Sequence, residues 1–109
     1  MGRVLFSSAL ISLVMVGSAA AQDPVARGAA VYDAQKCSVC HSIAGKGNAK
    51  GALDGVATKL SADDLRAWIV DAPGQTAKTK AARKPAMKAY ALPKEDVDAL
   101  VAYLTTLKK

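Results

Sequence analysis

Three side chains able to bind a metal or form a covalent link lie within five positions: the thiols of Cys37 and Cys40 and the imidazole of His41. Two thiols at this spacing can each add to one vinyl group of a porphyrin, and the adjacent histidine can then point its ring at the iron. The pattern Cys-x-x-Cys-His is typical of c-type haem attachment. The sequence therefore predicts one haem c, bound covalently through both cysteines, with His41 as an axial ligand.

Three other uses of the same residues are less consistent with the sequence. A thioredoxin-like redox pair lies near a βαβ pattern, and no strand pattern is visible here. A zinc site needs about four ligands, and this segment supplies three. A disulfide between Cys37 and Cys40 would close a loop too short to constrain much of the unfolded chain. We therefore prefer haem attachment.

The second axial ligand must be a different residue type, because His41 is the only histidine. Of the three methionines, Met1 and Met15 lie in an N-terminal segment that we expect to be removed, which leaves Met87. A methionine thioether commonly binds haem iron opposite the histidine. Met87 is the predicted second metal ligand, and a five-coordinate or lysine-ligated iron is the alternative.

An iron with both axial positions filled offers no open site to a small-molecule substrate. Its chemistry is then the gain and loss of one electron, which predicts an electron carrier and not an enzyme. Two alternatives remain open. One is a haem enzyme or gas-binding domain in which Met87 is displaced easily, and the other is an electron-entry subunit of a larger oxidoreductase complex.

The first 21 residues have the order of a secretory signal peptide. Arg3 supplies a positive start, residues 4–16 are mostly apolar, and small residues lead to the motif Ala19-x-Ala21. We therefore expect a signal peptide over 1–21, one domain over 22–109 and a periplasmic location. A retained membrane anchor is the alternative, which the serines within the segment and its small-residue ending disfavour.

Two helices are predicted in the first part of the domain. Asp23 followed by Pro24 is typical of an N-cap and first helical position, and the apolar spacing continues to about Gln35. Ser61 with an aspartate three residues later resembles a capping box. This second helix is expected to stop at Pro73-Gly74.

A third helix is predicted from about Pro93 to the end of the chain, with one face formed by Val97, Leu100, Val101, Leu104 and Lys108. Residues 42–59 are glycine-rich, residues 75–92 are basic, and both are expected to be irregular. No segment alternates as a strand does. The predicted class is all-α, with three to four short helices wrapped around the haem.

The formal net charge is +6, which permits an acidic partner. An exported protein rarely meets nucleic acid, so the expected partner is an acidic redox protein or a membrane respiratory complex, bound by a monomer. The basic residues near Met87 would form the contact. They are Lys78, Lys80, Arg83, Lys84 and Lys88.

Over residues 25–107 the sequence resembles the class I cytochromes c, small monohaem proteins of bacteria. The matching features occur in the family's order: Gly28 and Tyr32, the Cys37–His41 motif, the Leu53–Val56 segment, Trp68, Met87, and Leu100 with Tyr103. The resemblance implies the all-α cytochrome c fold. It also implies that the first and last helices cross where Gly28 permits a close approach.

One position departs from the family pattern. The usual run Gly-Pro-x-Leu-x-Gly, aligned on Leu53 and Gly55, places Gly51 where proline is usual. In the family the carbonyl of that residue accepts the ring N–H of the histidine ligand. The resemblance therefore implies a hydrogen bond from His41 to Gly51, on a more flexible backbone than the family's.

Overall fold

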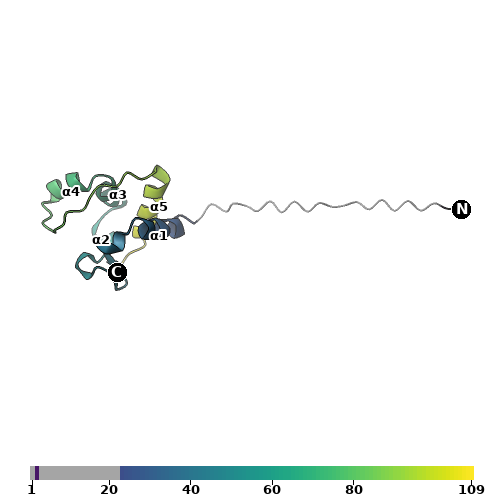
Figure 1. Cartoon of the computed structure of the whole chain (residues 1–109), viewed down its shortest axis with the longest axis horizontal. Coiled ribbons are helices and arrows are strands. Elements are labelled where there is room, and N and C mark those ends of the chain that lie inside the picture. The colour runs from purple at the N-terminus through teal and green to yellow at the C-terminus, as the bar shows by residue number, and fades with distance from the viewer. Residues whose placement is uncertain (1, 3–22) are drawn as a thin grey trace.

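The computed structural model describes Gly2 and residues 23–109 (Figure 1). Apart from Gly2, the predicted signal peptide and its cleavage motif lie outside the described residues. Within the described part, no helix has the length and apolar character needed to cross a membrane.

The described residues form five α-helices, two single-turn 3-10 helices and one very short hairpin, which confirms the all-α class with more helices than expected. The helices are α1 (Pro24–Ala34), α2 (Val56–Lys59), α3 (Ala62–Val70), α4 (Ala72–Thr79) and α5 (Lys94–Leu104). The 3-10 helices are Cys37–Val39 and Ala49–Gly51, and the antiparallel strands are β1 (Ser42–Ile43) and β2 (Lys46–Gly47). All of these minor elements fall between α1 and α2.

Helices α1 and α5 form the most extensive packing between two elements of the described chain and lie against each other in Figure 1. At the crossing, a Cβ on Gly28 would contact the Ala99 carbonyl oxygen and lie 2.6 Å from the Tyr103 Cβ. Tyr32 and Tyr103 pack edge to face beside it, with ring centroids 5.9 Å apart. The close approach implied for Gly28 is confirmed.

The apolar core lies between α1, α3 and α5. Its buried members are Val31, Tyr32, Leu65, Ile69, Val97, Leu100, Val101 and Leu104. Two ion pairs tie these helices together at the surface: Arg27 to Asp96 at 2.8 Å, and Arg66 to Asp98 at 2.7 Å.

The predicted extension of the last helix to Lys108 is wrong, because α5 ends at Leu104 and Lys108 is exposed beyond it. The hydroxyls of Thr105 and Thr106 donate to the carbonyls of Ala102 and Tyr103, at 2.8 and 2.6 Å. Such local bonds compete with the backbone pattern of a continuing helix.

The capping box at the start of α3 is confirmed. The Ser61 hydroxyl accepts the Asp64 N–H at 3.1 Å, and the Asp64 carboxylate accepts the Ser61 N–H at 3.2 Å. The irregular segments expected at residues 42–59 and 75–92 are wrong in part, because Val56–Lys59 forms α2 and residues 75–79 belong to α4. Asp71 caps this helix through the Gly74 N–H at 3.2 Å, and Pro73 stands in its first turn, where a missing N–H costs nothing.

Candidate functional site

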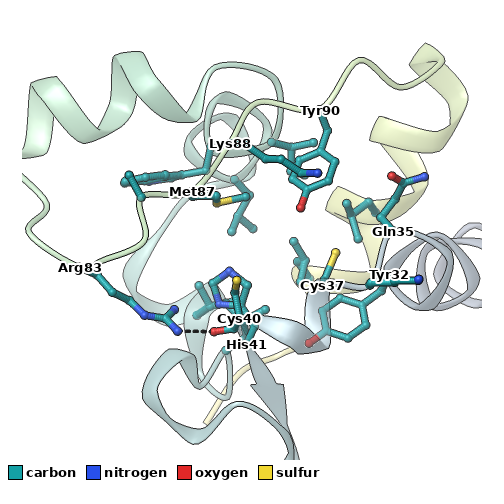
Figure 2. Close-up of a pocket in the computed structure, with 18 of the residues that line it drawn as sticks. Tyr32, Gln35, Cys37, Cys40, His41, Arg83, Met87, Lys88 and Tyr90 are labelled. Carbon is teal, nitrogen blue, oxygen red and sulfur yellow. Dashed lines mark hydrogen bonds between the residues drawn. The ribbon is translucent and has the colours of Figure 1, made fainter.

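A cavity of ≈ 570 Å³ opens between the helices and the segment that joins α4 to α5 (Figure 2). Its size is within the range of about 300–1,000 Å³ typical of cofactor sites. Its walls are mainly apolar, and they include Leu53, Val56, Leu65, Ile69, Leu100 and Leu104. The predicted residues Cys37, Cys40, His41 and Met87 all line this one cavity.

A tight turn after α1 brings the two cysteines and the histidine together. The turn begins at Lys36, whose φ of 55° is left-handed, and the Cys40 and His41 amides both donate to the Cys37 carbonyl, at 3.1 and 2.9 Å. Figure 2 shows both sulfur atoms and the His41 ring reaching into the cavity from the same side. Burial raises the pKa of the half-buried Cys37 thiol. The turn thus presents two thiols and one imidazole to a single ligand.

The His41 ring is oriented by the backbone of Gly51. The ring Nδ1–H donates to the Gly51 carbonyl oxygen at 2.9 Å, and the proton must be on Nδ1 because a carbonyl can only accept. The pKa of His41 is lowered, mainly by burial. The hydrogen bond to Gly51 acts to raise this pKa, and the positive charge of Arg83 acts to lower it further. The neutral ring therefore keeps a free lone pair on Nε2, which is the form that binds metal.

Met87 reaches the cavity from the opposite side. It is half-buried within the irregular segment that joins α4 to α5, and in Figure 2 its thioether lies across the cavity from the His41 ring. The Tyr90 N–H donates to the Ile69 carbonyl at 2.9 Å and fixes the segment three residues beyond Met87. The structure therefore places a nitrogen donor and a sulfur donor on facing walls.

Tyr90 and Arg83 also line the cavity, and neither was identified as a site residue from the sequence. The Tyr90 hydroxyl points into the cavity, and burial raises its pKa (Figure 2). Arg83, counted only as a surface charge, lines the wall and donates from its guanidinium to the Cys40 carbonyl. The position of Tyr90 just after Met87, in a chain with few aromatics, was the only sequence signal for it.

The predicted basic residues lie along one exposed stretch of the chain. Lys78 is in the last turn of α4, Lys80 follows it, and Lys84 is exposed in the irregular segment. Lys88 is exposed and also lines the cavity, where its ammonium lies 5.1 Å from the centre of the Tyr90 ring. Lys36 also lines the cavity, and it was not among the predicted basic residues because it lies just before the haem motif, far from the others in sequence.

Comparison with known proteins identifies one family. A family model described as Cytochrome c matches residues 25–108, which run from the first turn of α1 nearly to the end of the chain. No curated protein and no solved structure matches the chain. The small size fits a class I monohaem protein, and the spacing of Cys37 and Cys40 fits the family's attachment motif. The chain belongs to the cytochrome c family, whose members carry covalently bound haem c and generally transfer electrons.

Proposed function

We propose that this chain is a monohaem electron carrier in which Cys37 and Cys40 hold the haem and His41 and Met87 are its axial ligands. One observation carries the proposal: a histidine and a methionine face each other across an apolar cavity of ≈ 570 Å³ whose edge holds both thiols. The residues therefore fit a porphyrin, with a donor for each face, a thiol for each vinyl group and apolar walls around it.

Haem iron bound at this site supplies one-electron redox chemistry. The chain's part is to hold both donors in place in either oxidation state. The Gly51 carbonyl fixes the His41 ring, and the Tyr90 bond to Ile69 fixes the segment that carries Met87. The apolar walls limit water around the site, so little solvent must reorganise when the charge changes. With both axial positions filled, a substrate has no site at the metal, and no enzymatic step is proposed.

The absorption spectrum tests this ligation. We expect the oxidised protein to be low-spin with the weak far-red band of a sulfur–iron bond. Met87→Ala should abolish that band, open the sixth position and lower the reduction potential. Met87→His is the matched control, because it should restore a six-coordinate low-spin spectrum without the band. A wild-type spectrum that is high-spin and binds carbon monoxide readily would contradict the proposal and favour a haem enzyme or gas-binding domain.

We further propose that an acidic redox protein or membrane respiratory complex docks on the basic stretch from Lys78 to Lys88. The stretch is exposed and leads into the cavity wall at Arg83 and Lys88. Val39, between the two cysteines of the haem-attachment turn, is 68% exposed and offers an apolar contact to a partner. Charges at such a contact chiefly raise the association rate.

Electron-transfer kinetics test the docking surface. The bimolecular rate constant with an acidic redox protein should fall as salt screens the charges. Lys84→Glu should lower it further at low salt. Lys59→Glu, an equal charge change in α2 outside the stretch, should lower it much less. Equal effects of the two variants would mean that only the net charge matters and that this stretch is not the docking surface.

Export to the periplasm is the remaining part of the proposal. It is supported by the order of positive, apolar and small residues before Gln22. The mass of the mature protein should correspond to a chain that begins near Gln22. A mass that includes the first 21 residues would favour the retained anchor.

A further inference from the structure

We propose that Arg83 is a positioning residue that clamps the Met87 segment to the haem-attachment turn, and that Gly51 provides the space in which its guanidinium lies. The inference rests on the proposed function, because it takes His41 and Met87 as the two ligands. It adds a residue that the ligand set does not include. It also gives a reason for glycine at position 51.

The contact joins the two sides of the cavity. Arg83 lies four residues before Met87, and its guanidinium donates to the Cys40 carbonyl, 43 residues away in sequence. Cys40 belongs to the turn that presents His41, so the bond connects the methionine side to the histidine side (Figure 2). Arginine suits this position because its planar fork stays charged and holds a fixed geometry.

The segment that carries Met87 has few other attachments. Within the described part of the chain, hydrogen bonds tie residues 82–92 to the rest of the domain at two places, Arg83 to Cys40 and Tyr90 to Ile69. Met87 lies between these two anchors. Loss of the Arg83 anchor would leave the segment fixed on one side of the methionine only, with more conformations open to the thioether.

The Arg83 guanidinium lies in the space that a side chain at position 51 would occupy. A Cβ built on Gly51 would contact both the Cys40 carbonyl oxygen and the Arg83 Nη1, and would lie 2.9 Å from the Arg83 Cζ. Any side chain here, including the proline ring that is usual in related sequences, would occupy the space of the guanidinium. The carbonyl of this same residue orients His41, so Arg83 also restricts the peptide on which that bond depends.

The charge of Arg83 acts on the same site. The guanidinium lies against the backbone of Cys40 and Gly51. Cys40 precedes His41 in sequence, and the Gly51 carbonyl accepts the hydrogen bond from the His41 ring. A fixed positive charge there disfavours the more positive, oxidised form of a metal held by His41. Arg83 should therefore favour the reduced state as well as hold the segment.

The test uses the haem-loaded protein and two readouts. For Arg83→Gln, the ratio of oxidised to reduced protein at a fixed ambient potential should rise roughly fivefold to tenfold, where tenfold is 59 mV for one electron. The far-red band should also disappear at a lower temperature than in the wild type. Arg83→Lys keeps the positive charge but lacks the planar guanidinium. Its ratio of oxidised to reduced protein should therefore stay close to that of the wild type, while its far-red band should still disappear at a lower temperature.

Lys84→Gln is the matched control, since it removes the same charge from the next residue, which is exposed like Arg83 but does not line the cavity. It should change the ratio by less than about twofold and leave the band's thermal midpoint unchanged. If Lys84→Gln and Arg83→Gln changed the ratio and the thermal midpoint equally, the positioning role of Arg83 would be refuted and only a general effect of charge would remain.

Gly51→Ala tests the space for the guanidinium. It should lower the thermal midpoint of the band at least as much as Arg83→Gln does, since the added Cβ would also contact the Cys40 carbonyl oxygen. The double variant should be little worse than Gly51→Ala alone, because the Arg83 contact is already lost in that variant. Fully additive effects would overturn the coupling, and Arg83→Gln alone still tests the clamp if Gly51→Ala does not fold. A wild type without the band would refute the ligation itself. A wild type with the band, and Arg83→Gln unchanged in both readouts, would refute the clamp alone.

Discussion

Replacing Gly28 by alanine adds one methyl group at the point where α1 and α5 touch. Its carbon would contact the Ala99 carbonyl oxygen and lie 2.6 Å from the Tyr103 Cβ and 2.7 Å from the Ala99 carbonyl carbon. Carbon atoms in contact prefer about 3.5–4.0 Å. Backbone atoms and a Cβ cannot rotate away, so the helices must separate by about 1 Å at their crossing.

The magnitude follows from two opposing effects. Overpacking costs about 1–3 kcal/mol and occasionally more, and a clash with backbone belongs at the upper end. Alanine in a helix gains up to about 1 kcal/mol over glycine. The net loss for Gly28→Ala should be about 2 kcal/mol, and at about 4–8 °C per kcal/mol the haem-loaded protein should melt roughly 8–16 °C lower.

Thermal unfolding followed by far-UV circular dichroism measures this effect. Ala30→Gly is the matched control, because it makes the reverse change at an exposed position of the same helix. It should cost about 1 kcal/mol, the propensity difference without the packing. If Gly28→Ala were as stable as the wild type, or more stable, propensity would dominate and the close crossing of α1 and α5 would be refuted.

Two further predictions concern pH. Hydrogen bonds from Lys94 and Arg66 hold the pKa of Asp98 below its usual 3.8, so this carboxylate stabilises the fold above that pH and its contribution is lost as the pH falls through the lowered value. Asp98→Asn should be the less stable protein in urea at about pH 7, and the difference should close at about pH 2. Burial raises the pKa of Tyr32 from 10.0 to about 12, so its contribution is complete below pH 10 and lost as the pH rises toward 12. Tyr32→Phe should therefore keep its stability to a higher pH than the wild type in the same unfolding assay. An alkaline midpoint unchanged by the substitution would contradict this.

Local signals in the sequence were sufficient for the starts of the helices. The caps at Asp23 and Ser61 are bonds between neighbours, at 3.3 and 3.1 Å, and tertiary contacts do not alter them. The predicted stop of the second helix at Pro73-Gly74 is wrong, because α3 ends at Val70 and both residues lie in α4. A proline can end one helix and equally suits the first turn of the next. The second role applies here, because the Asp71 side chain caps the start of α4. That cap forms only after α3 has ended and the chain has changed direction.

The candidate site divides in the same way. The motif at Cys37 to His41 is contiguous, and Met87 follows from composition, so both could be named before the fold was known. Arg83 could not, because a bond between a side chain and a distant backbone carbonyl leaves no pattern in sequence. Gly51 was visible as a departure from the family's proline, but its consequence depends on which side chain lies above it.

The core and the site are built from shared residues. Leu65, Ile69, Leu100 and Leu104 are buried members of the core cluster and also line the cavity. No large side chain of the described residues is fully buried, so the polypeptide alone has no tightly enclosed centre. A domain of this size is already marginal in the surface it can bury. An apolar cofactor fixed by two thioether bonds would complete that core and could not be lost by dissociation. Residues that hold the electron-transfer site in place are therefore the same residues that hold the fold together.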